Sequence, residues 1–466
     1  MVSSSRQHYK FINSDTIAAI ATAPGISSIN VIRISGENAI ATVEKIFQGK
    51  IKLSQAKGNT VHFGKIINPV TKKMLDEVLV TVFKAPNSYT GEDMVEISCH
   101  GGNFVASAIL DLLLKIGARL AQPGEFTKRR VLAGKMDVTQ AEAILDLTQA
   151  KTETGFNQAI EQLQGKLSNF VNNLTADIKN IIVQLENLLE FEENEKTCEF
   201  RMPPIKKAIK QIATNLQNLI AQNEQLRFFR NGVYCAIIGR PNVGKSSLFN
   251  RLIENERAIV TEFPGTTRDS LQQTVVIDGI IFHLVDTAGL RSIKKPSGKE
   301  KIEAIGIEHT KHWLNSADFI LAIYDYSQTM TKDDELVYKL THSKPHLTIL
   351  NKVDLPKRFD VKYFGKEKFY EISAKYNQGI NQLKRAMVKY YQQKISSANN
   401  YLYLNQRHIT ALKEVVNLLA QIEHEQYLEN AIINLRSSLD TLTTLTNPIN
   451  NEEILDAIFK NFCIGK

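Results

Sequence analysis

The stretch that decides the fold is Val233-Tyr-Cys-Ala-Ile-Ile-Gly-Arg-Pro-Asn-Val-Gly-Lys-Ser-Ser-Leu-Phe-Asn250. Its apolar start and the pattern Gly239-x-x-x-x-Gly244-Lys245-Ser246 predict a strand, a phosphate loop and a helix. Such a loop turns its backbone amides toward a polyphosphate, Lys245 would bridge the outer phosphates, and Ser246 would ligate magnesium. A glycine-rich turn can match the pattern by chance, so downstream residues must support it. The residues predicted to bind nucleotide here are Asn242, Val243, Gly244, Lys245, Ser246 and Ser247.

Three later motifs, each at the end of an apolar, strand-like run, select the nucleotide. Asp286-Thr287-Ala288-Gly289 offers a carboxylate to the magnesium shell and an amide to the γ-phosphate. The aspartate of Asn351-Lys352-Val-Asp354 can accept two protons that guanine offers and adenine does not. Ser373-Ala374-Lys375 would hold the base oxygen through its backbone. Each motif alone is a common surface turn, but in this order they predict a guanine-nucleotide domain.

Length and composition indicate a larger protein than that domain. The chain has 466 residues, enough for about three domains. It contains no apolar run of about 18 residues and no signal-peptide core at its start, so we expect a cytoplasmic protein without a membrane span. Its cysteines, Cys99, Cys198, Cys235 and Cys463, lack metal-ligand spacing, which suits a reducing compartment. The net charge of +8 fits a nucleic-acid partner or ordinary solubility equally well.

Hydrophobic periodicity divides the rest of the chain. Residues 1–120 contain strand-like runs at 16–21, 28–35, 77–83 and 94–99 and a helical segment at 104–115, which predicts an α+β domain. Apolar residues from Leu163 to Leu188 and from Leu428 to Leu442 recur at helical spacing and predict a long-helix bundle. The pair Pro203-Pro204 is expected to stop a helix.

The predicted fold is therefore multidomain, α/β and α. An α+β amino-terminal domain spans 1–120, a helical domain comprises 121–231 and 390–466, and a P-loop α/β GTPase domain is inserted at 232–389.

Two features of the nucleotide domain bear on hydrolysis. Leu290 follows Asp286-x-x-Gly289 where small signalling GTPases carry the glutamine that orients the attacking water, so another polar group must do this. The second feature is a threonine-rich loop at 261–269, in which Thr267 would be the second magnesium ligand. Asn242 would then either ligate a monovalent cation that stabilises the transition state or only stabilise the loop turn. The nucleotide contacts expected in this loop are Thr261, Glu262, Phe263, Pro264, Gly265, Thr266 and Thr267.

The chain resembles, end to end, the MnmE (TrmE) family of tRNA-modification GTPases. The motifs that carry the resemblance are Gly-Arg-Pro-Asn-x-Gly-Lys-Ser-Ser at 239–247, Gly-Thr-Thr-Arg-Asp at 265–269, Asp-Thr-Ala-Gly-Leu at 286–290, Ile-Gly-Ile-Glu at 305–308, Pro-Gly-Glu-Phe at 123–126, Gln-Ala-Glu-Ala at 140–143 and Phe-Cys-Ile-Gly-Lys at 462–466. The last is highly specific, because other translation-associated GTPases share the loop motifs but not this tail.

The resemblance implies an activity and a set of partners. Members of the family add an aminomethyl or carboxymethylaminomethyl group to carbon 5 of the wobble uridine of certain tRNAs. They draw the carbon from a tetrahydrofolate derivative (5-formyl or 5,10-methylene) and work with an FAD-containing partner subunit in a heterotetramer. They form homodimers through the amino-terminal domain, and their nucleotide domains meet in the presence of potassium and GTP. The alternative is a ribosome-assembly or switch GTPase that acts by nucleotide-dependent binding.

Carried onto matching positions, the resemblance also implies site residues. Potassium would be bound by Asn242, Thr261, the Phe263 carbonyl and Thr266, and magnesium by Ser246 and Thr267. Glu303 would orient the attacking water, and Arg33, Glu96, Lys135 and Lys466 would bind the folate. The basic loop 291–301 is either a solvated face or a tRNA contact.

The carboxyl-terminal tail invites a prediction of its own. Phe462 and Ile464 are apolar and would favour docking, and Lys466 would suit an anionic ligand. We expect the tail to fold back onto the amino-terminal domain, with Cys463 acting as a nucleophile or as a positioning group. The competing expectation is an inert thiol in a frayed terminus.

Overall fold

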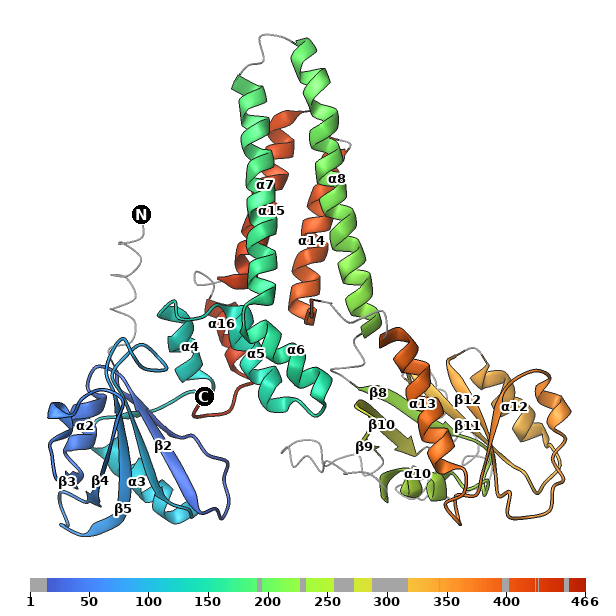
Figure 1. Ribbon diagram of the computed structural model, residues 1–466, viewed down its shortest axis with the longest axis horizontal. Helices are drawn as coiled ribbons and strands as arrows, with labels where there is room; N and C mark the ends of the chain where they lie inside the picture. The colour runs from blue at the N-terminus through green and yellow to red at the C-terminus, as the bar shows by residue number, and fades with distance from the viewer. Residues whose placement is uncertain are drawn as a thin grey trace, which may run out of the picture. The chain divides into compact units, whose positions relative to one another are not determined.

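A computed structural model describes most of the chain (Figure 1). The described residues are 15–190, 195–226, 232–254, 272–286, 317–342, 344–395, 402–423, 425, 427–447 and 452–466. They form two compact units, one made of 1–148, 160–213 and 406–466 and the other of 149–159 and 214–405. The predicted fold class is confirmed, since an α+β part, a long-helix part and a P-loop α/β part are all present.

The second unit contains a six-stranded sheet of order β13-β12-β11-β8-β10-β9. The strands are β8 (Val233–Ile238), β9 (Gln272–Ile277), β10 (Ile280–Asp286), β11 (Phe319–Asp325), β12 (His346–Asn351) and β13 (Phe369–Ile372). All neighbours are parallel except β9, which pairs antiparallel with β10. Every residue of β11 is buried, as expected for a parallel strand with helices on both faces.

Helices cover both faces of this sheet. Helices α10 (Lys245–Glu254) and α13 (Ile380–Ile395) pack over the face that carries Cys235 and Ile237. Helix α12 (Lys332–Thr341) packs over the opposite face, which carries Ala236 and Ile238. Neighbouring β8 residues thus alternate between two cores, one on each face of the sheet. Because helices cover both faces, the carboxyl ends of the strands form the open edge, where ligands bind in such folds.

The first unit contains a mixed seven-stranded sheet of order β3-β4-β5-β6-β2-β1-β7. Its elements are β1 (Ile17–Ile20), β2 (Ile29–Ser35), α2 (Ala39–Glu44), β3 (Phe47–Gly49), β4 (Thr60–Ile67), β5 (Met74–Phe83), β6 (Met94–His100), α3 (Asn103–Lys115) and β7 (Arg119–Leu120). The strands and the helix predicted from periodicity are confirmed. Helices α2 and α3 share one core with the inward face of the sheet.

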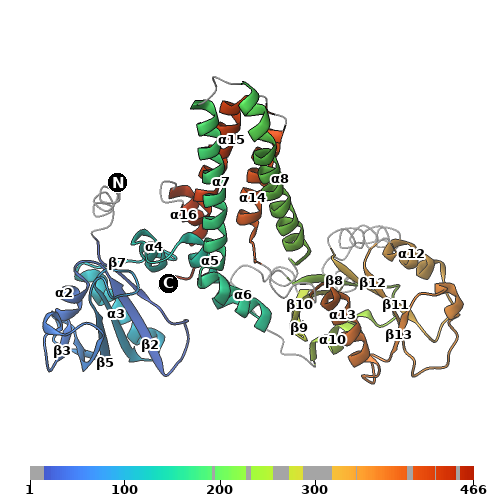
Figure 2. The same cartoon turned by 45° about the horizontal axis from the view of Figure 1, so that its top comes forward.

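The helical part of this unit combines segments from before and after the nucleotide sheet. Its helices are α4 (Glu125–Leu132), α5 (Val138–Gln149), α7 (Lys166–Glu190), α14 (Gln406–Glu423), α15 (Leu428–Thr446) and α16 (Glu452–Phe459). Helices α6 (Glu153–Leu163) and α8 (Glu195–Leu226) belong to this unit only in part, through residues 160–163 and 195–213. Helix α7 packs along α15, and α15 along α14, as both views show (Figures 1 and 2). The predicted apolar stripe of α7 is buried at Leu167, Leu174, Ile178, Leu185 and Leu188. No helix among the described residues is long and apolar enough to span a membrane.

One local prediction was wrong. Pro203 and Pro204 do not stop a helix but lie inside α8. Downstream in the same helix, Ile205, Ile209 and Leu216 are buried. Two prolines remove two backbone donors, at a cost of about 3 kcal/mol each in a helix interior. Burial of this downstream apolar face opposes that cost, at about 25 cal/mol per Å² of apolar surface.

A buried charged cluster joins the two sequence halves of the helical part. Glu142 of α5 accepts hydrogen bonds from Arg407 Nε and Nη2, both at 2.9 Å, and pairs with His408 Nε2 at 2.7 Å. Arg407 also donates to the carbonyls of Thr444 and Leu445 at the end of α15. Burial alone would raise the pKa of Glu142, but the hydrogen bonds from His408 and Arg407 outweigh it and lower the pKa from 4.5 to about 2.

This cluster yields a stability prediction. Because the folded-state pKa of Glu142 is depressed, its stabilisation is complete above pH 4.5 and is lost as the pH falls toward about 2. A shift of that size corresponds to about 3 kcal/mol in the free energy of unfolding. We expect Glu142→Gln to cost about this much at neutral pH, measured by urea denaturation, and the difference from wild type to shrink in acid.

The matched control is Glu423→Gln, which removes an exposed 2.6 Å pair with Lys210 between α8 and α14. An exposed pair contributes less than about 1 kcal/mol. Equal destabilisation by the two substitutions would contradict the special role of the buried cluster.

Candidate nucleotide-binding site

The predicted phosphate loop connects β8 to α10 in a conformation that requires its glycines. Gly244 has φ +100°, and a Cβ there would lie 2.2 Å from Asn351 Nδ2. A Cβ on Gly239 would lie 2.4 Å from the carbonyl oxygen of Ile323. Asn242 has φ 64°, a left-handed conformation that asparagine tolerates better than most residues. The loop therefore approaches the neighbouring strand ends too closely for other side chains.

Asn351 holds the loop against a second predicted motif. Its Nδ2 donates to the Val243 carbonyl at 2.8 Å, and its Oδ1 accepts from the Ala374 amide at 3.0 Å. Both contacts are buried. Phosphate loop, Asn-Lys-x-Asp motif and Ser-Ala-Lys motif are thus brought together at the carboxyl ends of β8, β12 and β13.

The rest of the pocket follows from these motifs. Asp354 Oδ1 accepts a 2.6 Å hydrogen bond from Ser373 Oγ. Lys245 Nζ donates to the carbonyls of Gly239 and Arg240, both at 2.8 Å, so its ammonium lies inside the loop. A cavity of about 510 Å³ opens here, and its lining includes Gly244, Ser247, Asn351, Lys352, Asp354 and Lys375. Its floor therefore combines phosphate-loop backbone with the carboxylate predicted to recognise guanine.

Several predicted nucleotide residues lie outside the described part of the chain. They are Thr261, Glu262, Phe263, Pro264, Gly265, Thr266, Thr267, Thr287, Ala288, Gly289 and Glu303. Asp286 is the last residue of β10, at the same sheet edge as the loop. Ser246 is exposed in the first turn of α10, where a phosphate-bound magnesium ion would be reached.

A second candidate site lies in the first unit, where the tail docks as predicted. The Cys463 carbonyl accepts from the Gly124 amide at 3.3 Å, and the Gly465 carbonyl accepts from Arg33 Nη1 at 3.2 Å. Phe462 is buried against Phe459 of α16. Ile464 is 50% exposed, so the prediction that it helps docking is wrong. A backbone hydrogen bond from Gly124, a side-chain hydrogen bond from Arg33 and the buried Phe462 hold the tail instead.

Arg33 is the centre of that second site. It forms a 2.8 Å ion pair with Glu96 on the neighbouring strand, and its guanidinium lies over the rings of Tyr89 and Phe126. Of the predicted folate ligands, Arg33 and Glu96 are thus brought together beside the tail that ends in Lys466.

The fourth predicted folate ligand, Lys135, is attached to the loop that carries Tyr89. Its Nζ donates to the carbonyls of Pro86 and Ser88, the latter at 2.8 Å. Cys463 is exposed at the surface of the tail.

Two family models match most of the chain. A family model described as the MnmE helical domain matches residues 138–463, and one described as the GTP-binding protein TrmE N-terminus matches residues 16–135. The chain belongs to the MnmE (TrmE) family. Curated relatives, each named tRNA modification GTPase MnmE, match 97% of this chain. They come from Alkaliphilus oremlandii (39% identical, 99% of that protein covered), Thermoanaerobacter pseudethanolicus (40%, 99%) and Lactiplantibacillus plantarum (38%, 98%).

Among solved structures, the FeoB G-domain from Methanococcus jannaschii covers 34% of this chain and 98% of its own length, at 27% identity and a TM-score of 0.24.

Besides the predicted Lys352, the nucleotide site of this MnmE-family chain contains Asp325, which no sequence motif indicated. Lys352 Nζ donates to the Asn242 carbonyl and to Asp325 Oδ2, both at 2.7 Å. Asp325 is buried, which alone would raise its pKa, but hydrogen bonds from Lys352 and Ser327 lower it. The carboxylate is therefore charged and fixes the lysine under the phosphate loop. The position of Asp325 at the end of the apolar strand β11 is the sequence pattern that could have indicated its role.

Arg251 is a second such residue. From α10 it donates through Nε to the Ala374 carbonyl and through Nη2 to the Lys375 carbonyl, both at 3.2 Å. These contacts orient the Ser-Ala-Lys motif of the MnmE-family site. Nothing in the local sequence around Arg251 indicates this role, because the contact joins segments more than a hundred residues apart.

Proposed function

We propose that this MnmE-family GTPase couples GTP hydrolysis to modification of carbon 5 of the wobble uridine of certain tRNAs. The product would carry an aminomethyl or carboxymethylaminomethyl group, with the carbon drawn from a tetrahydrofolate and FAD supplied by a partner subunit in a heterotetramer. The observation that carries the proposal is the tail docked on Arg33, in a chain that also holds a guanine-type pocket. Such a protein would work in the cytoplasm, where tRNA is found.

The nucleotide pocket suits GTP with magnesium. Asp354 lines the cavity and its carboxylate is held by Ser373, so it would be available to accept the two guanine protons. Ser246 at the start of α10 and Thr267 would hold the magnesium ion, which would neutralise charge between the outer phosphates.

The first functional prediction concerns base specificity. Because Asp354 would accept two guanine protons, Asp354→Asn should lose GTP affinity and gain affinity for xanthosine triphosphate. A site built to pair such groups discriminates by roughly ten thousandfold against a ligand that leaves them unmatched. Titration with fluorescent analogues measures both affinities. Asp360→Asn, an exposed neighbour, is the control that should keep GTP preference. Unchanged GTP binding in Asp354→Asn would rule out the assignment.

Hydrolysis would need groups beyond the phosphate loop. Glu303 is proposed to orient the attacking water, since Leu290 cannot. A potassium ion held by Asn242, Thr261, the Phe263 carbonyl and Thr266 would neutralise transition-state charge. The Asn242 carbonyl already accepts from Lys352, which leaves its side chain for the ion. The left-handed conformation of Asn242 also supports the alternative that this residue stabilises the turn of the phosphate loop.

Monovalent salts test the potassium proposal. Removing one preorganised group that stabilises transition-state charge typically costs about a hundredfold in rate. We therefore expect single-turnover GTP hydrolysis to be slower by up to that factor in sodium chloride than in potassium chloride at matched ionic strength. Equal rates in the two salts would eliminate a specific potassium site.

The folate site would use the contacts around Arg33. Arg33 and Glu96 are partly exposed, so their charged groups remain reachable by a ligand. Lys466 would attract the glutamate carboxylates of a folate, and Lys135 would do so from the Tyr89 loop. Cys463 would face the one-carbon unit, as a nucleophile or as a positioning group.

Truncation tests the tail. Deleting residues 463–466 should abolish modification of tRNA while GTP hydrolysis stays nearly intact, because the phosphate loop belongs to the other unit. Nucleoside analysis of tRNA from cells carrying the truncated chain measures the first effect, and phosphate release measures the second.

A second variant separates chemistry from docking. Normal modification by the truncated chain would refute the tail site and leave the alternative of a ribosome-assembly or switch GTPase. Normal modification by Cys463→Ser would refute only the nucleophile.

The proposed homodimer also has a structural basis. The face of β4 and β5 opposite α2 and α3 carries Val61, Phe63 and Leu79, and the last two are cross-strand partners. Phe63 is 62% exposed in the single chain. Neighbouring apolar side chains on one outward sheet face favour burial against a second copy.

Substitution on this face tests the dimer. Phe63→Asp should convert the dimer to a monomer, because a carboxylate would be desolvated without a partner. Phe104→Asp is the control, since Phe104 is 85% exposed, even more than Phe63, but lies on α3, away from this face. Light scattering after gel filtration gives the mass. A Phe63→Asp dimer as stable as wild type would place the interface elsewhere.

A further inference from the structure

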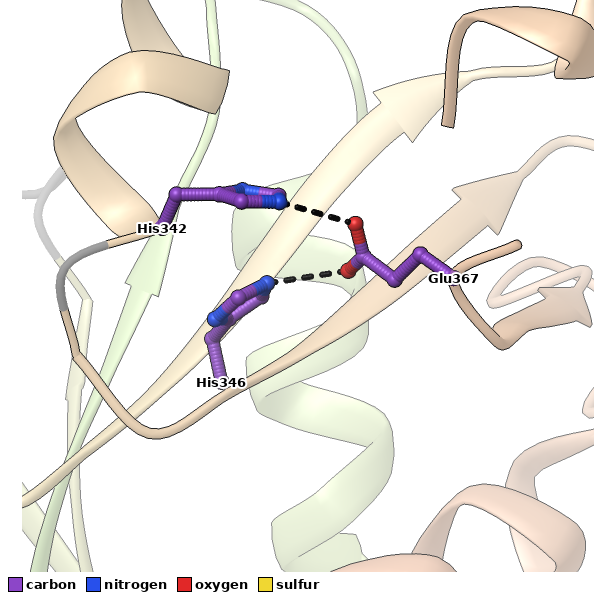
Figure 3. A group of neighbouring side chains, drawn as sticks. All are labelled: His342, His346 and Glu367. Atoms are coloured by element: carbon purple, nitrogen blue, oxygen red, sulfur yellow. Dashed lines mark hydrogen bonds and ion pairs between the residues drawn. The ribbon is translucent and has the colours of Figure 1, made fainter. Parts of the chain in front are cut away.

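Three side chains that can ligate a metal meet at the end of β12 opposite the nucleotide pocket (Figure 3). His342 follows α12, His346 begins β12, and Glu367 precedes β13. Glu367 uses both oxygens, with Oε2 3.2 Å from His342 Nε2 and Oε1 2.9 Å from His346 Nε2. Asn351, which holds the phosphate loop, is the last residue of the same strand, about 16 Å away along it.

The hydrogen bonds around His346 define which ring nitrogen faces the carboxylate. Nδ1 lies 2.8 Å from the Lys344 carbonyl, which can only accept, so Nδ1 carries a proton. In a neutral ring, Nε2 then presents a lone pair to Glu367 Oε1. That oxygen already accepts from Thr348 Oγ1 at 2.5 Å. Two acceptors therefore face each other, an arrangement that needs a cation or a second proton between them.

The other half of the cluster has the same need. Glu367 Oε2 is buried and accepts no hydrogen bond from any residue that the structure describes. Its neighbour there is His342. The centroid of the His342 ring lies 3.9 Å from the ring centroid of Tyr338 and 4.8 Å from that of His346. The two imidazoles thus converge on one carboxylate from two different elements.

The distances suit one ion. All the ligand atoms lie within 4.8 Å of one another. Zinc binds imidazole nitrogen and carboxylate oxygen at about 2.1 Å, so two of its ligand atoms lie about 3.0 to 3.4 Å apart. The histidine–glutamate distances already fall close to this range. The Lys344 carbonyl orients His346 through its other nitrogen, as is usual for metal-bound histidine.

We propose that His342, His346 and Glu367 bind a divalent transition-metal ion, with Zn²⁺ as the ion whose chemistry fits best. Two nitrogens and one carboxylate suit zinc rather than magnesium, which prefers oxygen ligands. His342 is 39% exposed on its side chain, so solvent reaches the fourth position. The ion would fasten the end of α12 to the starts of β12 and β13.

Metal titration of the full-length chain tests this site. We expect the metal-free wild-type chain to bind one Zn²⁺ in calorimetry with magnesium in excess. His342→Ala and Glu367→Gln should each bind Zn²⁺ at least about tenfold more weakly. Even the loss of a residue that only hydrogen-bonds to a metal ligand weakens metal binding by that much. His100→Ala is the matched control. His100 is exposed and pairs with Asp76 at 2.7 Å, but no second imidazole joins them among the residues that the structure describes, so zinc affinity should stay unchanged.

Two further readouts keep the test decisive. Zn²⁺ should raise the midpoint of thermal unfolding of wild type and of His100→Ala but not of His342→Ala, since binding to the native state stabilises it. Bound Co²⁺ should show nitrogen and oxygen ligation without a thiolate charge-transfer band. The proposal would be overturned if wild type bound no stoichiometric Zn²⁺, or if His342→Ala and Glu367→Gln bound it as tightly as wild type. A thiolate band with Co²⁺ would also overturn it. The cluster would then be a protonated ion-pair group.

Discussion

The structure depends on closure of a helical unit whose two halves are separated in sequence by the whole nucleotide sheet. Helix α7 comes before that sheet and helices α14 and α15 come after it, yet they bury one another's apolar stripes. Hydrophobic burial drives this closure but is not directional. The buried carboxylate of Glu142 supplies direction, because its hydrogen bonds to Arg407 and His408 form only when α5 and α14 are in register. Leaving that charge unpaired in the interior would be strongly destabilising.

A second charged network fixes α4, the helix against which the tail packs. Arg129 of α4 is only 3% exposed and contacts Asp15, Glu92 and Glu125. Burial would raise the pKa of Glu125, but hydrogen bonds from Arg119 and the Gln122 amide, together with Arg129, hold it below its usual range. The network therefore stays charged and fixes α4 against the amino-terminal sheet.

The position of α4 in turn determines where the chain ends. Val131 at the end of α4 shares a core with Leu455, Phe459 and Phe462. Gly124, just before α4, has φ +68°, and a Cβ there would lie 2.9 Å from both phenylalanines. The glycine of the Pro-Gly-Glu-Phe motif thus leaves room for the tail. The tail site is a consequence of packing between segments more than three hundred residues apart.

Sequence alone determined the features whose physics is local. Strand and helix periodicity, the phosphate-loop glycines and the order of the guanine motifs predicted both sheets, the long helices and the pocket residues, because each depends on neighbours within a few positions. Tertiary structure decided the rest. Helix α8 continues through Pro203 and Pro204, and its downstream face is buried. Ile464 stays 50% exposed, while the Arg33 side chain holds the Gly465 carbonyl of the tail. Asp325 reaches Lys352, and His342 and His346 reach Glu367, only because parallel strands place distant residues at one sheet edge. Such contacts leave no periodic pattern in the sequence.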